Sequence, residues 1–358
     1  MHFDLFYELA VPPQLGRSEA QTYADALAEW ELADRLGFRC VWLVEHHFMR
    51  GYSHSSKPEM VLAAAAQRTR RLRLGLGIVP LPYHHPVHVA ERLATLDILS
   101  GGRLEAGVGR GFSPEEFAVF GASMGESREV AAESLAVLRA SFAPGPLTHH
   151  GALWRFDALD VLPKPLQQPA PPLWTAAVSP ESFDWAAQEG IGALAGPFKP
   201  WFMVRHDLER FRAAWRGPGP ARAGMTVGIL CLEDGERAKR LAHDPFLWFY
   251  RELYRTTLPV LEKLYPGYER FRELGRFRAL VKLGINYTLL DTFGLVVAGD
   301  PDECERKLRA FVAAGVTHLL LAVGAGAVPT AVARESLACL ATHVLPRFAT
   351  SAAHAAPA

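Results

Sequence analysis

The residues best suited to chemistry lie directly after apolar runs of this chain. Glu45, His46 and His47 follow the run CVWLV, and Arg110 follows the run RLEAGVG between two glycines. Histidine exchanges protons near neutral pH, so His46 is a candidate acid or base. An arginine framed by glycines presents an unobstructed guanidinium and exposed backbone amides, which suit a phosphate group. These positions therefore indicate proton transfer and phosphate binding.

A third candidate site is the start of a helix after the run PLWTAAV. Ser179 is expected to cap this helix, with Pro180 as its first residue and Ser182 in its first turn. Free amides and the dipole at such a terminus bind phosphate, although capping alone also explains the serines. The corresponding plainer alternatives are a loop histidine bonded to backbone for His46 and a tight-turn arginine for Arg110.

Glycines and histidines around the third apolar run allow two further interpretations. Gly75 and Gly77 would let the backbone approach a planar ligand closely, but they do not form the GxGxxG pattern of a dinucleotide site. His84 and His88 are four residues apart, which would suit metal ligands on one helix face. Because Pro86 is a natural first helical residue, the helix is expected to start after His84, and we expect no metal site.

The elements that must position these residues alternate between strand and helix. Apolar runs such as residues 2–9, 40–45 and 103–109 are separated by amphipathic helical segments, which indicates parallel βαβ units. About eight strands can be counted, which favours a closed (β/α)8 TIM barrel over an open sheet. The carboxyl ends of all strands then meet on one face, where catalytic groups of such barrels collect.

A single domain is expected to span residues 1–349, because no second fold-like block is present. The Pro/Gly-rich stretch 143–172 is interpreted as a surface excursion, since the strand–helix alternation resumes after it. Residues 243–293 form a long insertion after the seventh strand and are rich in aromatic residues and arginines. The Ala-rich residues 350–358 are expected to be a disordered tail.

Composition excludes several classes of protein. Lys+Arg and Asp+Glu both number 38, so the neutral chain is not expected to bind nucleic acid or an anionic membrane surface. No apolar stretch reaches the ~20 residues of a membrane helix, and the first strand leaves no room for a secretion signal. The four scattered cysteines are expected to be reduced core residues. These features predict a cytoplasmic location.

Several motifs, taken in order, resemble the bacterial luciferase-like family of flavin-dependent oxidoreductases. They are Glu45-His46-His47, the strand end Gly75–Pro80, the HPxxxAE pattern from His85 to Glu91, and the G-x-x-R-G pattern that holds Arg110. Members of that family are (βα)8 barrels that bind FMN, reduced flavin or the deazaflavin F420. The resemblance implies that His46 is catalytic with Glu45 beside it. It also implies a flavin ring near Gly77 and Ile78, with a cis peptide bond between these two residues.

The resemblance assigns the remaining cofactor contacts to Gly109, Arg110, Val178, Ser179 and Ser182. In the family, the arginine and the two hydroxyls contact the flavin phosphate. Bacterial luciferase has a cysteine in place of Gly109, so this chain lacks a thiol near the ring and bioluminescence is not expected. Val178 replaces an acidic residue of luciferase, which alters local contacts. The insertion 243–293 falls where relatives carry a mobile lid over the flavin.

The function implied by the resemblance is that of a two-component flavin-dependent monooxygenase. It would take reduced FMN from a separate flavin reductase, react it with O2 and oxygenate a small organic substrate. An F420-dependent oxidoreductase on the same barrel and a non-catalytic flavin-binding protein remain alternatives, and a metal-dependent barrel hydrolase is more distant. Relatives dimerise through the helices that correspond to residues 58–70 and 87–99, so a homodimer is expected.

Overall fold

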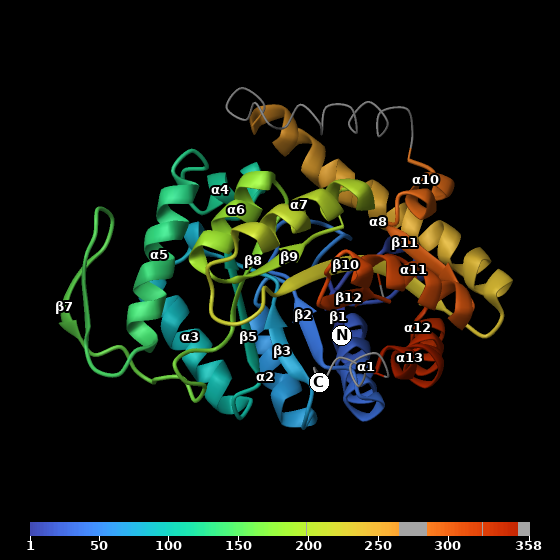
Figure 1. Ribbon diagram of the computed structural model, residues 1–358, viewed down its shortest axis with the longest axis horizontal. Coiled ribbons are helices and arrows are strands. Elements are labelled where there is room, and N and C mark those ends of the chain that lie inside the picture. The colour runs from blue at the N-terminus through green and yellow to red at the C-terminus, as the bar shows by residue number, and fades with distance from the viewer. Residues whose placement is uncertain (198, 265–284, 324, 350–358) are drawn as a thin grey trace, which may run out of the picture.

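A closed parallel barrel forms the centre of the molecule (Figure 1). The computed structural model describes residues 1–197, 199–264, 285–323 and 325–349. Among these residues, eight strands each pair in parallel with the next, and the last pairs with the first (Figure 1). In order around the barrel they are β1 (His2–Tyr7), β2 (Cys40–Leu43), β3 (Arg73–Leu76), β5 (Leu104–Gly109), β8 (Leu173–Ala177), β9 (Gly192–Ala195), β10 (Ala223–Cys231) and β12 (His318–Ala322). The expected (β/α)8 barrel is therefore confirmed.

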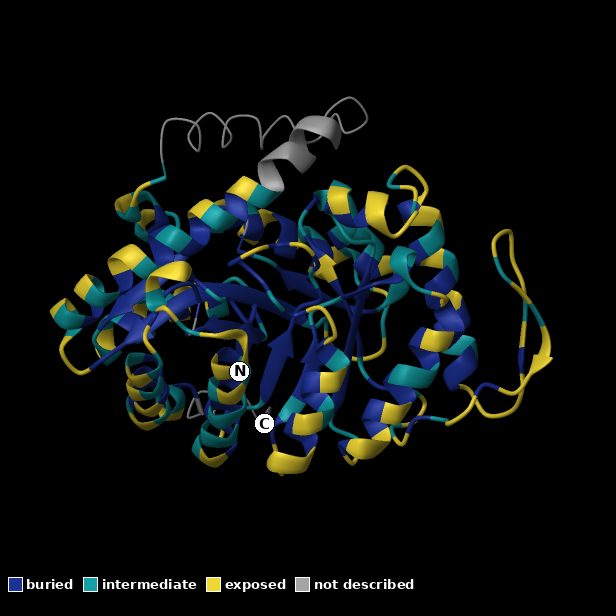
Figure 2. Ribbon diagram, turned by 180° about the vertical axis from the view of Figure 1, so that it is seen from behind, coloured by how far each residue is buried: buried dark blue, intermediate teal, exposed yellow. Residues whose placement is uncertain are grey.

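Helices surround the strands and turn their buried faces toward them (Figures 1 and 2). They are α1 (Glu19–Leu36), α2 (Pro58–Arg68), α3 (Pro86–Leu99), α4 (Pro114–Val119), α5 (Ser127–Phe142), α6 (Pro180–Glu189), α7 (Trp201–Ala214), α8 (Gly235–Leu264), α10 (Tyr287–Thr292), α11 (Pro301–Ala313), α12 (Thr330–Cys339) and α13 (Leu345–Ala349). Short 3-10 turns lie at Pro13–Leu15 and Leu81–Tyr83, and a π-helical segment, Leu340–Val344, joins α12 to α13. Local sequence sets the ends: the Ser18 hydroxyl caps α1, and Gly37 closes it in the left-handed conformation.

The stretch 143–172 contains strands that the sequence did not predict. β6 (Leu147–His150) and β7 (Arg155–Leu159) pair in an antiparallel hairpin that projects from the side of the barrel (Figure 1). The Glu133 carboxylate on α5 fastens the tip, because it accepts hydrogen bonds from the backbone N–H groups of residues 152–154. A carboxylate twenty residues away in sequence thus satisfies the turn, and no local pattern shows this.

Two short strands extend the barrel at its rim. β4 (Val79–Pro80) pairs with the end of β5, and β11 (Val296–Gly299) pairs with the end of β10. β11 was not expected from the sequence. The helix α8 begins at Gly235, so the expected start of the insertion, residue 243, lies within a helix. Residues 265–284 of the insertion and the expected tail 350–358 lie outside the described residues.

A network of buried charges fills the amino-terminal end of the barrel, which we call the floor. Its members are Asp4, Arg39, Trp42, Arg73, Glu105 and Trp174. Glu105 receives the guanidinium groups of Arg39 and Arg73 on one oxygen, and the Trp174 indole N–H at 2.6 Å on the other. Asp4 receives the Trp42 indole N–H at 2.8 Å and Arg39 at 3.1 Å. Buried carboxylates are stable only when paired and hydrogen-bonded in this way.

The indole rings of Trp42 and Trp174 pack edge to face above the floor, with ring centroids 5.3 Å apart. A Cβ atom at Gly75 would overlap the ring of Trp42, and one at Gly192 would overlap the ring of Trp174. Gly75 is therefore explained by core packing, whereas the sequence alone left room for ligand contact there.

The described helices include none that is long and apolar enough to cross a membrane.

All four cysteines are buried and unbonded, as expected from their spacing. Three of them nevertheless converge in space, with the Sγ atoms of Cys231 and Cys339 3.7 Å apart and Cys304 in hydrogen-bonding contact with Cys231. Their burial raises the pKa of the Cys339 thiol to about 12, so it remains protonated at neutral pH.

Candidate active site

His46 lies past the carboxyl end of β2, in the mouth of the barrel. Its backbone N–H donates to the carbonyl of Ser55 (2.9 Å), which fixes the loop. Its imidazole lies between two acids: Nε2 is 3.9 Å from Glu8 Oε2, and Nδ1 is 3.6 Å from Glu116 Oε1. The ring of Phe112 meets it edge-on at 5.3 Å. The His46 side chain is 14% exposed, so one side of the ring faces the opening.

Glu45 turns its carboxylate toward two other histidines. Its Oε1 accepts a hydrogen bond from His84 Nε2 at 2.6 Å and lies 3.3 Å from His47 Nε2. Burial alone would raise the pKa of Glu45, but the hydrogen bonds from His47 and His84 outweigh it and lower the pKa to about 2. Glu45 is therefore ionised and ties the loop after β3 to the loop after β2. His88 instead bonds Glu91 at the surface, 3.2 Å away, so His84 and His88 do not converge.

Glu116 connects three segments at the mouth. It lies in the first turn of α4, where the Ser113 side chain accepts its N–H. Its Oε1 accepts the backbone N–H of His47 at 2.8 Å, and its Oε2 accepts the hydroxyl of Tyr83 at 3.1 Å. A Cβ atom at Gly111, which has φ +73°, would come within 2.5 Å of that hydroxyl. The glycine after Arg110 is thus required for this contact.

Glu8 approaches His46 from β1. Its Oε1 accepts the hydroxyl of Tyr52 at 2.9 Å, and its backbone carbonyl accepts the hydroxyl of Ser53 at 2.8 Å. Burial raises the pKa of Glu8, although the neighbouring His46 and the Tyr52 hydrogen bond oppose that rise. For His46, burial and the neighbouring charges act on the pKa in the opposite directions, and the charges dominate. Burial lowers its pKa, but the Glu116 and Glu8 carboxylates outweigh burial, so the pKa of His46 is raised.

The strand ends beside His46 carry the expected glycines. The peptide bond between Gly77 and Ile78 is cis, as the family resemblance implied. A Cβ atom at Gly77 would have no neighbour nearer than 3.7 Å, whereas one at Gly109 would meet Ile78 Cδ1 at 2.9 Å. A methyl group at Gly77 would thus make ordinary van der Waals contact with Trp42 and Leu194, whereas Gly109 lets β5 pass close to Ile78.

Ser179 and Ser182 form a capping box at the start of α6. The Ser182 hydroxyl oxygen accepts the N–H groups of Val178 and Ser179, each at 3.0 Å, and its hydrogen is donated to the Ser179 carbonyl at 2.6 Å. The Ser179 hydroxyl, in contrast, has only a weak 3.5 Å contact with Ser182 Oγ to donate into. Ser179 is therefore the serine with a donor to offer a ligand, and Ser182 supports it.

The residues predicted from the sequence gather on four neighbouring strands. His46 follows β2, Gly77 and Ile78 follow β3, Arg110 follows β5, and Ser179 follows β8; these strands are adjacent in the barrel. The proton-transfer candidate therefore lies at one end of a row of strand ends and the phosphate candidates at the other. Such a row matches a long, flat ligand with a terminal phosphate.

Glu8 Oε2, Glu45 Oε2 and His46 Nδ1 lie at the mouth and are buried, and they have no hydrogen-bond partner among the described residues. Buried polar atoms are almost always satisfied in folded proteins, so these atoms are expected to bind ligand or water. A flavin offers N–H and hydroxyl donors to the carboxylates and a phosphate to Arg110 and Ser179. The residues at the mouth fit this cofactor.

Glu8, Tyr52 and Glu116 were not predicted as site residues. Glu8 follows a strand in the same way as Glu45, so the strand-end argument could have included it. Glu116 stands in the first turn of a short helix, where an acidic residue is commonly explained by the helix dipole. Tyr52 lies in a loop, and nothing in its neighbouring sequence indicates that it contacts Glu8.

A sequence model of the luciferase-like monooxygenase family matches residues 1–318, and the chain belongs to that family. Limonene 1,2-monooxygenase from Rhodococcus erythropolis is 42% identical over 329 residues, which cover 89% of this chain and 79% of that protein. The oxygenase component of a flavin-dependent trigonelline monooxygenase from Acinetobacter baylyi is 33% identical over 200 residues, 55% of this chain. That match covers 54% of the relative, so the chain spans about half the length of several curated relatives that it matches.

Solved structures share the fold over nearly the whole chain. The monooxygenase RslO1 from Streptomyces bottropensis has a TM-score of 0.81 and 30% identity, with 97% of this chain and 100% of that chain covered. The oxygenating constituent of 3,6-diketocamphane monooxygenase from Pseudomonas putida, in complex with FMN, has a TM-score of 0.79 at 21% identity and covers 97% and 98%. The F420-dependent tetrahydromethanopterin reductase from Methanopyrus kandleri has a TM-score of 0.70 at 21% identity and covers 97% and 99%.

Proposed function

We propose that this protein is the oxygenase component of a two-component monooxygenase that uses reduced FMN and O2 to oxygenate a small organic molecule. Its membership of the luciferase-like monooxygenase family supports an oxidoreductase activity. Relatives named as flavin-dependent oxygenase components support reduced flavin as the cofactor and a separate flavin reductase as the partner. The observation that carries the proposal is His46 between two buried carboxylates, at one end of a row of strand ends with phosphate-binding groups at the other.

The proposed cofactor contacts follow the row of strand ends. Arg110 and Ser179 bind the phosphate, with Ser182 and Val178 shaping the capping box behind it. Gly77, Ile78 and Gly109 lie where the ring is expected, and Gly109 keeps β5 close to Ile78. When bound, the flavin supplies the redox chemistry with O2, and the protein supplies position, dryness and proton exchange.

In the proposed reaction, the protein itself exchanges protons and excludes water. His46 lies beside the expected ring position and holds or delivers a proton at its imidazole, while Glu45 stays ionised and orders His47 and His84. On the described part of α8, Phe249 stacks near Tyr52 with ring centroids 5.5 Å apart. We propose that residues 243–293 act as a hydrophobic lid on this side, which keeps water from the reacting groups.

An anaerobic titration with reduced FMN and, separately, reduced F420 tests the cofactor. We expect reduced FMN to bind more tightly, and we expect admission of air with a suitable substrate to yield product with one oxygen atom from O2. Tighter binding of reduced F420, with substrate oxidation that consumes no O2, would replace the proposal by an F420-dependent oxidoreductase. Binding of FMN without any turnover across a substrate panel would support the non-catalytic alternative.

We also propose a homodimer that buries α2 and α3. These helices pack together and carry exposed apolar side chains, among them Met60 at 70% exposure and Leu99 at 48%. Apolar groups so exposed on adjacent helices favour an interface. Light scattering at micromolar concentration should give twice the mass of 39.4 kDa, and a monomer mass would refute the dimer. The buried, unbonded cysteines support a reducing compartment such as the cytoplasm.

A further inference from the structure

Tyr7, the last residue of β1, and Glu8, directly after it, form matching tyrosine–glutamate pairs on opposite sides of the barrel wall. Tyr7 points outward and donates its hydroxyl to Glu29 on α1 at 2.7 Å. Glu8 points inward and accepts the hydroxyl of Tyr52 at 2.9 Å. Because side chains alternate across a strand, neighbouring positions face different surroundings. The outer pair faces a helix, and the inner pair faces His46.

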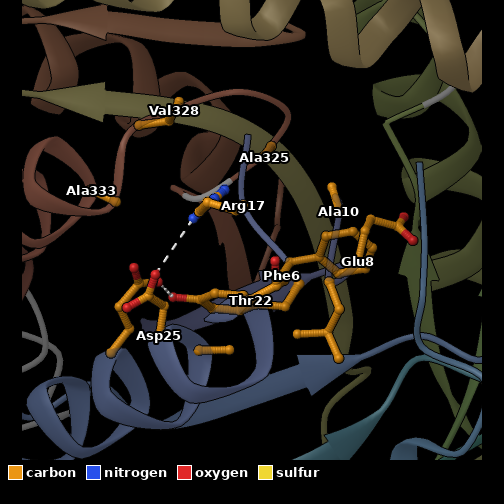
Figure 3. Close-up of a pocket in the computed structure, with 13 residues that line it drawn as sticks. Phe6, Glu8, Ala10, Arg17, Thr22, Asp25, Ala325, Val328 and Ala333 are labelled. Atoms are coloured by element: carbon orange, nitrogen blue, oxygen red, sulfur yellow. Dashed lines mark hydrogen bonds and ion pairs between the residues drawn. The ribbon is translucent and has the colours of Figure 1, made fainter. Parts of the chain in front are cut away.

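The outer pair lies beside a small cavity of about 40 Å³ between β1, α1 and the segment before α12. Arg17 and Asp25 form an ion pair at 3.9 Å in its wall (Figure 3). The Glu8 carboxylate is directed away from both of these residues in Figure 3. The cation of this cavity therefore does not neutralise Glu8, although Glu8 contributes to the cavity wall.

The partner that Glu8 does approach is His46. Its Oε1 is used by Tyr52, and its buried Oε2, which has no hydrogen-bond partner among the described residues, lies 3.9 Å from His46 Nε2. The Glu8 side chain is only 6% exposed, so water screens this pair weakly. A hydrogen bond from Tyr52 stabilises the charged form of Glu8 and aims the carboxylate at the imidazole.

We propose that Glu8, held by Tyr52, is a positioning residue that keeps His46 cationic, so that His46 enters the proposed reaction as a proton donor. Its role in the reaction depends on the function proposed above, whereas the charge of His46 does not. The same imidazole faces Glu116 on α4 at 3.6 Å and the neighbouring Glu45, while Phe112 and Tyr52 supply the uncharged walls. Burial opposes the cation, and these carboxylates together favour it; Glu8 is the one that faces Nε2.

Tyr52 also links this arrangement to α8. The Tyr52 ring is buried and packs against Phe249, with centroids 5.5 Å apart. Gly326, in the segment after β12, in turn lies so close to α8 that a Cβ atom there would be 2.9 Å from Phe249 Cβ. The ring that carries the hydroxyl is therefore packed against α8, and α8 is in turn packed against the segment after β12.

The test is a titration of His46 in the flavin-free protein, followed by NMR with 13C-labelled histidine. The His46 signal is identified by its loss in His46→Gln. In Glu8→Gln the Tyr52 hydrogen bond can persist while the charge is lost, so we expect the His46 midpoint to fall by about one pH unit. Tyr52→Phe should lower it less, because the carboxylate remains but loses its donor. An unchanged midpoint in Glu8→Gln would overturn the proposal.

Glu29→Gln is the matched control, because it alters the other tyrosine–glutamate pair and leaves the mouth intact. Its His46 midpoint should equal that of the parent, and an equal fall in this variant would show a general effect of burial and refute a specific role for Glu8. In turnover, the alkaline limb of product yield per O2 consumed should shift to lower pH in Glu8→Gln by the same amount as the NMR midpoint. If the NMR midpoint shifts while no variant or parent turns over, the proposed function fails and the charge assignment stands.

Discussion

The floor and the mouth of the barrel are both built from buried acids that face nitrogen-bearing side chains, but they are satisfied to different degrees. At the floor, each oxygen of Glu105 and Asp4 has a donor among the described residues. At the mouth, Glu8, Glu45 and His46 each keep one buried atom that has no hydrogen-bond partner among the described residues. The same kinds of residue therefore form a closed structural network at one end and an open site at the other.

The pKa shifts follow this difference. At the floor, burial and the nearby Arg39 lower the pKa of His318 to about 2, so this histidine stays neutral. At the mouth, the carboxylates around His46 outweigh burial and raise its pKa. Burial and nearby arginines thus lower the pKa of the histidine at the floor, whereas nearby carboxylates raise the pKa of the histidine at the mouth.

Replacing His46 should give the largest effect and should separate chemistry from stability. His46→Ala removes a group whose acid–base help is typically worth about 10²–10⁴-fold in rate, so product formation should fall by that range. Flavin affinity should change little because the phosphate contacts lie on β5 and α6. O2 would still be consumed and released as hydrogen peroxide, which a peroxidase assay measures. If this variant kept the product yield and coupling of the parent, His46 would be a structural loop residue without a catalytic role.

Glu105→Ala, at the floor, should instead lower the stability of the protein and leave the site at the mouth intact. It leaves the partly buried guanidinium groups of Arg39 and Arg73 without their shared acid. Breaking such a buried network by removing one partner typically costs about 3–5 kcal/mol of unfolding free energy. Urea unfolding should show this loss, while the folded fraction retains its flavin affinity. Loss of affinity without loss of stability would mean that the two ends are not independent.

Arg110→Ala should weaken FMN binding, and this effect is expected to be smaller than the two effects above. A charge-assisted hydrogen bond to a phosphate is worth about 1.5–3 kcal/mol, so FMN affinity should fall about tenfold or more. Riboflavin, which lacks the phosphate, is the matched ligand and should bind parent and variant alike in calorimetry. An equal loss of affinity for both ligands would show that Arg110 does not bind the phosphate.

The smallest expected effect is on the pH dependence of stability, and its sign differs between the two ends. Burial raises the pKa of Asp4 from 3.8 to about 6, so its stabilising contribution is present below about pH 4 and is lost as pH rises through about 6. The pKa of Glu45 falls from 4.5 to about 2, so its contribution is present above pH 4.5 and is lost as pH falls through about 2. Asp4→Asn should remove the first slope and Glu45→Gln the second. Urea unfolding across pH measures both, and identical slopes in parent and variants would contradict these assignments.

Much of the fold and part of the site could be predicted from the sequence. The alternation of apolar runs and helices predicts the barrel, and residues after those runs, such as His46 and Arg110, must then lie at its mouth. Glu116 and Tyr52 could not be assigned, because each acts through tertiary contacts that leave no periodic or spacing signal. The hairpin of β6 and β7 was missed for the same reason: Glu133 satisfies its turn from a separate helix. Local patterns thus place residues at an end of the barrel, and tertiary contacts decide what each one does there.

The two tyrosine–glutamate pairs of β1 also determine which kinds of mutation this strand can accumulate. Loss or gain of a single codon within β1 would turn Tyr7 and Glu8 to exchanged faces and break both pairs at once. A substitution, in contrast, touches one face and leaves the other intact. The outer pair can therefore drift toward apolar residues that suit a helix interface, while the inner position stays tied to His46. In descendants of this chain, length variation is expected between Glu8 and α1 and not in β1 or at Glu8.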